Sequence, residues 1–405
     1  MIKSTSLLVC AYSHKVSHGA VDCFCTHLLF TIHCFWHISD LHWDYTYKLG
    51  DDPSLVCSSS GRRPAEGAGK FGHYVCDSPW ELINSSIYAM KNILEHPDFI
   101  VWTGDDTPHV PNEDLGEEKV LFIIEGLTQI IKQLFPSGYY TERLLNRPGF
   151  RVLVLNTNLY YDQNSVTENM QDPANQLQWM DDVLSKGIHL HPRQLNKAWF
   201  RPHFNKRYLE LIQKHHCVIM GQFFGHHHTD SFRMFYSDEN PVSTIFLTPG
   251  VTPWKTTLPG VDDGANNPGI RIFEYDSETL LVKDMITFYF NLTHANNARA
   301  RWEKEYRLTE AFHVPDASPA SMHRIMENMA GDSCILQKYY EFNSVSYDRK
   351  PCNAGCRINH ICAIREVDFE MYKHCVETGD TSPTVEGAIW LLVLSAVSEI
   401  VIPSL

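Results

Sequence analysis

The chain has 405 residues, a formal net charge of −14 and an isoelectric point near 5.8. Its length suits one large domain plus a smaller one, because single hydrophobic cores stop growing at about 250–300 residues. The acidic balance argues against nucleic acid as a partner, since binding to a phosphate backbone needs a basic face.

The N-terminal segment, residues 1–34, matches a secretory signal only in part. Lys3 precedes a short apolar run from Leu7 to Tyr12, and two histidines interrupt a second run, residues 23–36. A signal peptide needs a basic residue, a continuous apolar stretch and a small-residue cleavage site. We therefore expect an imperfect signal region or an alternative start here.

From Phe35 onwards, short apolar runs alternate with helical stretches, which is typical of an α/β arrangement. The runs predict strands at residues 35–39, 99–103, 151–156, 218–222, 244–248, 270–275 and 280–286. Apolar spacing of three and four residues predicts helices at 117–134, 173–186 and 206–215. A further helix follows Ser78, which we expect to cap it, with Pro79 in its first turn and Glu81 completing a capping box.

After about residue 296 the strand pattern stops and helical, cysteine-containing sequence follows. We therefore expect a main domain at 35–295 and a small helical domain at 296–375. Five of the twelve cysteines fall in the last quarter of the chain: Cys334, Cys352, Cys356, Cys362 and Cys375. Such clustering predicts disulfides and an oxidising compartment. A zinc site is the alternative, but the spacings do not form two paired knuckles.

Two further patterns point to export. Asn84 and Asn291 each begin a glycosylation sequon. In the final segment, 376–405, small residues at 379–382 precede a spacer and an apolar tail from 387 to 405, which is the order of a GPI-anchor signal. A transmembrane helix is the alternative, but Glu399 interrupts the tail and no basic residues follow it. We expect a glycoprotein that is GPI-anchored at the cell surface or secreted.

Candidate metal ligands follow three of the predicted strands: Asp40 and His42, then Asp105, then His226 and His228. In open α/β sheets ligands bind beyond the carboxyl ends of the strands, so these side chains are expected to meet. Each pattern alone is usually a turn or a surface loop, and only their joint placement favours a site. Carboxylates and imidazoles together suit zinc, manganese or iron.

These residues, in this order, resemble the calcineurin-like metallophosphoesterases, and the flanking sequence narrows the resemblance to the acid sphingomyelinase-like phosphodiesterase family. The passages that carry it are FWHISDLHWD (35–44), CDSPWELINSSIYAMK (76–91), FIVWTGDDTPHVP (99–111), LNTNLYY (155–161), GQFFGHHHTDSFRM (221–234) and TPGVTPWKTTLPGVDDGANNPGIRIFEYD (248–276). The resemblance extends over residues 35–375. It implies an α/β fold, a β-sandwich flanked by helices, with a small helical, disulfide-containing C-terminal domain.

The resemblance also implies two zinc ions per chain. Asp40 and His42 would bind the first zinc together with His228 and a bridging carboxylate, Asp105, and His226 would serve the second zinc.

His109 matches the family histidine that contacts the scissile phosphodiester and assists the leaving group. The implied activity is hydrolysis of a phosphodiester in a sphingomyelin-type lipid or a nucleotide-like molecule. The resemblance suggests a disulfide between Cys57 and Cys76, and we expect further pairings within Cys352, Cys356, Cys362 and Cys375.

Two departures from the family put the second zinc in doubt. The family has a Gly-Asn-His-Asp motif that supplies an Asn ligand and a further histidine, but no Gly-Asn-His triplet occurs in this chain. The family also has an apolar strand ending in Gly-His-Val-Pro between Lys186 and Trp199, where this chain offers only His189 and His191 as substitutes. We therefore expect an incomplete core and a weak or empty second site.

The resulting hypothesis is a monomeric, zinc-dependent phosphodiester hydrolase that reaches the membrane surface through a lipid anchor. The alternative is a catalytically impaired form that acts as a lipid- or protein-binding surface protein.

Overall fold

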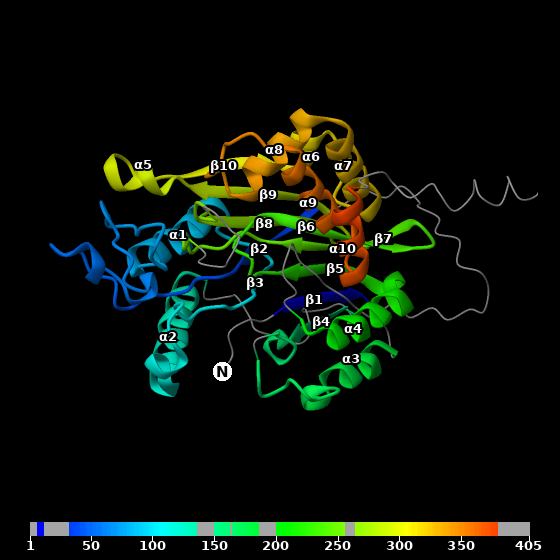
Figure 1. Ribbon diagram of the computed structural model, residues 1–405, viewed down its shortest axis with the longest axis horizontal. Helices are drawn as coiled ribbons and strands as arrows, with labels where there is room; N and C mark the ends of the chain where they lie inside the picture. The colour runs from blue at the N-terminus through cyan, green and yellow to red at the C-terminus, as the bar shows by residue number, and fades with distance from the viewer. Residues whose placement is uncertain are drawn as a thin grey trace, which may run out of the picture.

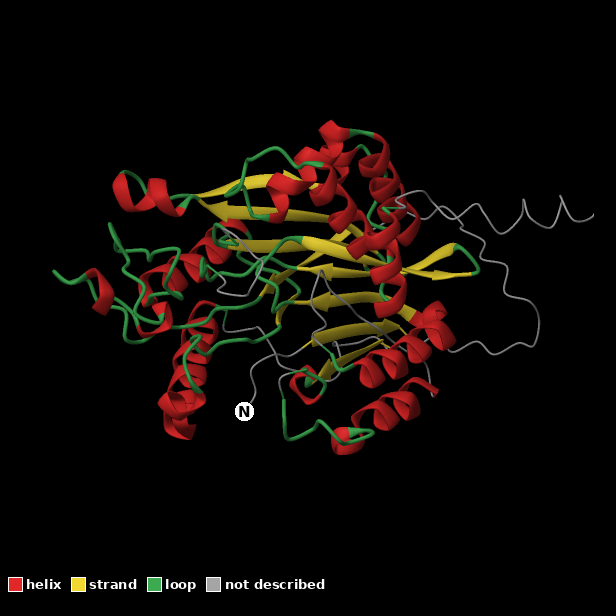
Figure 2. Ribbon diagram, in the orientation of Figure 1, coloured by secondary structure: helices red, strands yellow, loops and turns green. Residues whose placement is uncertain are grey.

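The computed structural model describes residues 6–11, 32–135, 150–162, 164–185, 200–255 and 264–379. Within these ranges the chain forms two five-stranded sheets flanked by helices (Figures 1 and 2). This confirms the predicted α/β sandwich with a helical, disulfide-containing C-terminal part.

The first sheet has the strand order β10-β9-β8-β2-β3. β2 pairs in parallel with β3 and antiparallel with β8. The strands are β2 (Ile32–Ile38), β3 (Phe99–Trp102), β8 (Gly269–Asp276), β9 (Val282–Phe290) and β10 (Trp302–Arg307).

The second sheet has the order β4-β1-β5-β7-β6. Its strands are β1 (Ser6–Ala11), β4 (Phe150–Leu155), β5 (Ile219–Phe224), β6 (Ser231–Ser237) and β7 (Asn240–Leu247). β1 lies between β4 and β5 and is antiparallel to both, with Val9 opposite Val152 on one side and Gly221 on the other. The apolar run that the sequence places in an imperfect signal region therefore forms a strand inside this sheet.

Alternation along β2 shows how the layers are assembled, because successive side chains of a strand point to opposite faces. Phe35 belongs to the buried cluster between the two sheets, whereas Trp36 and Ile38 pack with α1 (Trp80–Ile93) and α2 (Asn112–Leu134). On the outer face of the second sheet, α3 (Gln176–Ser185) and α4 (Pro202–His215) pack on β4, β5 and β7. The sandwich therefore has four layers, with helices outside both sheets.

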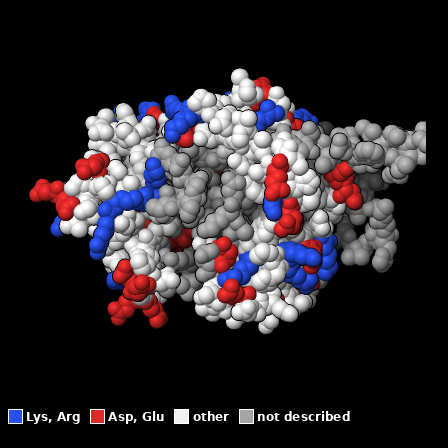
Figure 3. All heavy atoms as spheres, in the orientation of Figure 1, with Lys and Arg blue, Asp and Glu red and all other residues white. Residues whose placement is uncertain are grey.

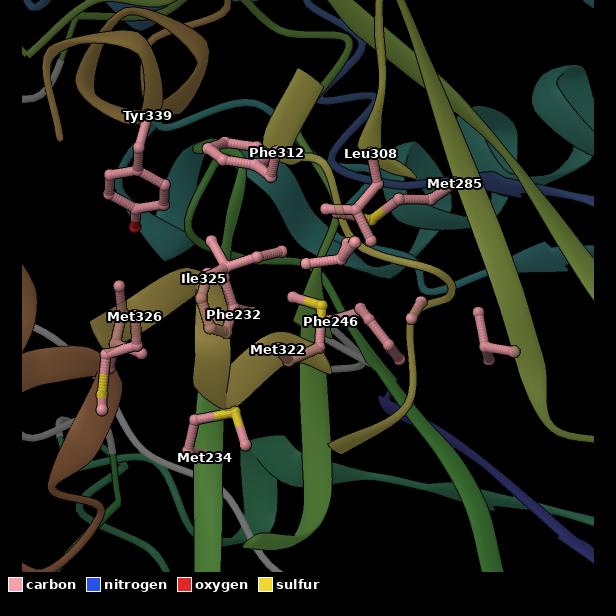
Figure 4. Close-up of a cluster of buried hydrophobic side chains, with 14 of the residues drawn as sticks. Phe232, Met234, Phe246, Met285, Leu308, Phe312, Met322, Ile325, Met326 and Tyr339 are labelled. Carbon is pink, nitrogen blue, oxygen red and sulfur yellow. The ribbon is translucent and has the colours of Figure 1, made fainter. Parts of the chain in front are cut away.

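Of the C-terminal helices, the first packs in the cluster of α1 and α2, and the other five form a group against β6, β7 and β9 (Figure 1). In chain order, the C-terminal helices are α5 (Leu292–Asn297), α6 (Leu308–Phe312), α7 (Pro319–Gly331), α8 (Ser333–Asn343), α9 (Ala354–Arg365) and α10 (Phe369–Thr378). Figure 4 shows Met322 and Ile325 of α7 beside Phe232 and Phe246 of the second sheet, in one cluster with Phe312. Helices and sheets thus share a continuous core. Short 3₁₀ turns occupy Pro53–Leu55, Ser58–Ser60, Thr157–Leu159, Pro173–Asn175 and His216–Val218.

Disulfides form as expected, between Cys57 and Cys76 and within the C-terminal group, between Cys352 and Cys356 and between Cys362 and Cys375. Cys334 remains a free, exposed thiol.

Four sequence predictions need correction. The Ser78 side chain does not cap α1, because the Ser78 backbone is held by His42 and Asp44 and the helix starts after Pro79. The predicted helix at 117–134 is present, but the sequence missed the short helical stretch that precedes it from Asn112, across a kink at Gly116 where φ is 61°. β6 was missed. So was β10, which joins the first sheet from beyond residue 296, where the sequence predicted that strands end.

Several expectations fall outside the described residues: His189 and His191, the junction at 136–149, and the apolar tail after residue 380. Over the part of the chain that is described, no helix is both long and apolar enough to cross a membrane.

Candidate functional site

The loops that follow β2, β3 and β5 bring the five predicted metal ligands to one edge of the sandwich. All five adopt positive φ: 53° at Asp40, 38° at His42, 61° at Asp105, 71° at His226 and 60° at His228. Non-glycine residues rarely adopt this conformation, and such strain gathers at functional sites. The fold therefore holds a less favourable backbone here in order to place these side chains together.

Backbone contacts fix this arrangement. The Asp40 N–H donates to the Gly104 carbonyl at 2.9 Å, and the His226 N–H donates to Asp40 Oδ1 at 2.6 Å. A side chain at Gly225 would collide with Ser39 and Asp40. Glycine at that position therefore lets the loop after β5 approach the loop after β2.

Asp40, His42, Asp105 and His228 form a compact buried cluster, in which the potential ligand atoms lie within 4.8 Å of one another. The Nε2 atoms of His42 and His228 are 3.1 Å apart. His42 Nδ1 lies 2.7 Å from the Thr107 carbonyl and can only donate to it, so the lone pair of the neutral ring is on Nε2, toward the cluster. This is a donor set that could hold a metal ion.

Asp40 supplies a direct test of that fit. Its Oδ2 atom is buried and has no hydrogen-bond partner. A buried carboxylate oxygen without a partner is costly, and a bound cation would satisfy it. The residues present therefore fit a metal ion.

The electrostatics of the cluster agree with metal binding. Burial, and then the charge of Asp105, raise the pKa of Asp40 well above its usual value. Burial also opposes ionisation of Asp105, but the charges of His42 and His226 outweigh it and lower the pKa of Asp105 to about 2. Burial, followed by the charge of His109, lowers the pKa of His42 to about 4. The shifts of Asp105 and His42 favour what a metal needs, an ionised carboxylate and a neutral imidazole, whereas the raised pKa of Asp40 favours a protonated carboxyl, which a bound cation would ionise.

His226 lies on the other side of Asp105. Asp105 Oδ2 is 2.5 Å from His226 Nδ1 and 3.6 Å from His42 Nε2. A carboxylate that lies between two imidazoles is placed to bridge two metal ions, one held by each imidazole. Over the described ranges, His226 belongs to no group of three or more potential ligands, so the second position is poorer than the first.

His109 joins the cluster from the loop after β3. Its ring stacks on His42 with centroids 4.1 Å apart, and it forms a group with His42 and His228. Its backbone N–H donates to Asp77 at 2.7 Å, and Nδ1 lies 3.0 Å from the Asp77 carboxylate. The sequence analysis assigned no role to Asp77, although it lies in the passage 76–91 that carries part of the family resemblance.

The two sequon residues occupy different environments. Asn291 is exposed and caps α5, with its side chain accepting from the His294 N–H at 2.9 Å, whereas Asn84 is half-buried within α1. Glycosylation at both stays a prediction.

A two-sheet sandwich that gathers Asp-x-His, Gly-Asp and His-x-His at its strand ends defines the class of metal-dependent phosphoesterases. Comparison with known proteins gives the family. The family model "Acid sphingomyelin phosphodiesterase C-terminal region" matches residues 240–382.

Relatives cover almost the whole chain. The sequence is 47% identical to acid sphingomyelinase-like phosphodiesterase 3b of Homo sapiens, over 91% of this chain and 95% of the relative, and 50% identical to the Mus musculus protein of that name, over 89% and 93%. It is 33% identical to cyclic GMP-AMP phosphodiesterase SMPDL3A of Rattus norvegicus, over 85% and 91%. The chain therefore belongs to the acid sphingomyelinase-like phosphodiesterase family, and by family it is a phosphoric diester hydrolase.

Proposed function

We propose that this chain binds zinc and hydrolyses a phosphodiester in a sphingomyelin-type lipid or a nucleotide-like molecule. The observation that carries the proposal is the convergence of Asp40, His42, Asp105 and His228 in one buried cluster. Two carboxylates and two imidazoles suit four-coordinate zinc, although manganese and iron accept similar ligands.

When bound, the metal would supply Lewis-acid polarisation of a phosphodiester oxygen and lower the pKa of water. The chain's own residues supply position and protons. Since His109 Nδ1 is engaged by Asp77, its Nε2 is the nitrogen left to face the reacting phosphodiester and to give a proton to the leaving oxygen.

The names of the relatives support both substrate classes. One relative, 32% identical over 84% of this chain and 92% of its own length, is the sphingomyelinase phosphodiesterase C of Dictyostelium discoideum, and others are named for cyclic GMP-AMP. A phosphodiester is the chemistry that these molecules share.

The test is to measure zinc by elemental analysis and turnover of a nitrophenyl phosphodiester by the purified chain. Asp40→Asn and His228→Asn should each lose both metal and activity. His96→Asn is the control, because the His96 side chain is 85% exposed and belongs to neither group of potential metal ligands among the described residues. Variants that keep full zinc and full turnover would refute the proposal.

The alternative is a catalytically impaired surface protein that binds lipid or protein. It is favoured by the second position, where Asp105 and His226 are the candidate ligands, since a catalytic zinc normally has about three protein ligands. A version with the two missing family segments restored separates the two functions. The alternative would be favoured if this chain held one zinc and showed little turnover, while the restored version held two zincs and showed high turnover.

For location, we propose a GPI anchor attached through the 376–405 segment. Phosphatidylinositol-specific phospholipase C should then release the protein from cells. Protein that stays on the membrane with its C-terminal tail intact would exclude the anchor.

A further inference from the structure

His109 is held from three sides by groups that come from distant parts of the chain. His42 stacks on one face of the ring at 4.1 Å, and Trp254 stacks on the other at 3.8 Å with the two planes only 2° apart. Asp77, fully buried, engages Nδ1 and the backbone N–H at the ring's edge. The ring therefore has little freedom to turn.

Two of these three groups are fastened to a single residue, Ser59. The Asp77 N–H donates to Ser59 Oγ at 2.8 Å, and the Trp254 indole N–H donates to the Ser59 carbonyl at 3.1 Å. Ser59 is itself anchored, because its N–H and its hydroxyl both donate to Asp44 Oδ2, at 3.0 and 2.7 Å. Ser59 is 3% exposed, so these bonds are shielded from water.

A disulfide closes this arrangement. Ser59 lies two residues after Cys57, and Asp77 directly follows Cys76, the disulfide partner of Cys57. The disulfide therefore holds together the two short segments that carry Ser59 and Asp77. Thr252, two residues before Trp254, donates to Asp77 Oδ1 at 2.9 Å. This bond connects the loop that carries Trp254 to the loop that carries Asp77.

We propose that Ser59, within the loop closed by Cys57 and Cys76, is the positioning residue for His109. It sets the orientation of the His109 ring through Asp77 and Trp254 and touches neither the metal ligands nor the phosphodiester. This inference rests on the proposed hydrolytic function for its kinetic consequence, but not for its structural one.

The chain offers a matched control in the neighbouring residue. Ser58 lies in the same 3₁₀ turn, and its hydroxyl also donates to Asp44, at 3.2 Å, but it bonds to neither Asp77 nor Trp254 in the contacts that the structure gives. Ser59→Ala and Ser58→Ala thus remove the same group from the same turn and the same acceptor. Only the first removes the acceptor of the Asp77 N–H.

The first measurement does not depend on activity. Histidine-selective ¹⁵N NMR of the zinc-loaded protein, with His109→Gln to assign the signals, reports whether each ring nitrogen of His109 carries a proton. We expect a protonated, hydrogen-bonded Nδ1 in the wild type and in Ser58→Ala. In Ser59→Ala we expect these signals to shift or broaden toward exchange between tautomers.

The second measurement is steady-state hydrolysis of a nitrophenyl phosphodiester. Ser59→Ala should lower kcat by about 10- to 100-fold with little change in KM, because a misplaced group loses transition-state contacts more than substrate binding. Trp254→Phe keeps the stacked ring but loses the bond to Ser59, and should lower kcat by a smaller factor. Ser58→Ala should match the wild type.

Unchanged His109 signals and unchanged kcat in Ser59→Ala would overturn the inference. Equal effects of Ser59→Ala and Ser58→Ala would also overturn it, because both variants lose a hydrogen bond to Asp44 and that loss would then explain the effect. If the wild type turns over no diester, the hydrolytic proposal fails, and the NMR comparison alone decides whether Ser59 positions His109.

Discussion

His37 lies fully buried between the two sheets and is held in its neutral form. The Thr248 hydroxyl lies 2.6 Å from Nδ1, and the Thr103 hydroxyl lies 3.0 Å from Nε2. Burial, and then the charge of Arg271, lower the pKa of His37 well below its usual range. Protonation of this ring therefore opposes folding.

This predicts a specific pH dependence of stability. Because the pKa of His37 is lower in the folded than in the unfolded chain, the unfolded chain gains the proton first. The stabilisation is complete above about pH 6.5 and is lost as the pH falls below it, by up to about 1.4 kcal/mol per pH unit. His37→Asn should flatten the profile of unfolding free energy between pH 6.5 and 5, measured by urea denaturation. His96→Asn, at an exposed site, should not, and parallel profiles for the wild type and His37→Asn would contradict the assignment.

His109→Gln should separate catalysis from metal binding. His109 lies beside the cluster, but Asp40, His42, Asp105 and His228 form a four-ligand group without it, so we expect zinc content to stay at the wild-type level. Loss of a proton donor typically lowers kcat by about 10²–10⁴-fold. Elemental analysis and a nitrophenyl diester assay on one preparation check both expectations, and zinc loss from this variant would show that His109 is a ligand instead.

The ligand residues could be predicted from the sequence because each one directly follows an apolar run, as Asp40 and Asp105 do. Asp77 and Trp254 could not. Both lie in passages that carry the family resemblance, but their roles arise only when three loops far apart in sequence meet at His109.

At the scale of elements, β1 is the feature that the sequence concealed. An unbroken apolar run at residues 7–12 is equally compatible with an export signal and with a strand buried on both faces. β1 lies between β4 and β5, the strands that flank in chain order the segment where the resemblance predicts a further strand. β10 was missed because Trp302–Arg307 has no apolar run and is rich in charged residues, as edge strands often are.

The place of β1 in the sheet can be tested with proline. Val9 lies opposite residues of both neighbouring strands, so Val9→Pro removes a donor in the middle of the ladder. The free energy of unfolding should fall by about 1–3 kcal/mol, the cost of leaving a buried acceptor unpaired. Val9→Ile, which keeps the N–H and the branched side chain, is the control. Equal stability of the proline variant and the wild type would show that β1 is not part of the cooperative fold.

At the scale of the whole molecule, charge and metal binding are the properties to consider. α2 carries the exposed acidic residues Glu113, Asp114, Glu117 and Glu118. Figure 3 shows acidic side chains gathered over this helix, while basic side chains lie in separate small groups on this face. No broad basic field is visible on the described part of this face, and the exclusion of nucleic acid stays a prediction.

Metal binding should be visible in overall stability. A ligand bound only by the folded state stabilises it by about 2.7 kcal/mol at 100 times its Kd. Chelation should therefore lower the melting temperature, and added zinc should restore it. Asp40→Asn should melt at the same temperature with and without chelator. An equal chelator effect in this variant would place the stabilising metal elsewhere.

The position of β1 also has a consequence for the order in which the protein assembles. β1 lies far before its partner strands in the chain, since they are near residues 150–155 and 219–223. Closing such long loops is entropically costly, and pairing across them is slow. β1 can pair with β4 only after about residue 155 has been made, and with β5 only after about residue 223. Until β1 pairs, the edge of β4 that it covers stays open, and an open edge is a site where another nascent chain can add a strand.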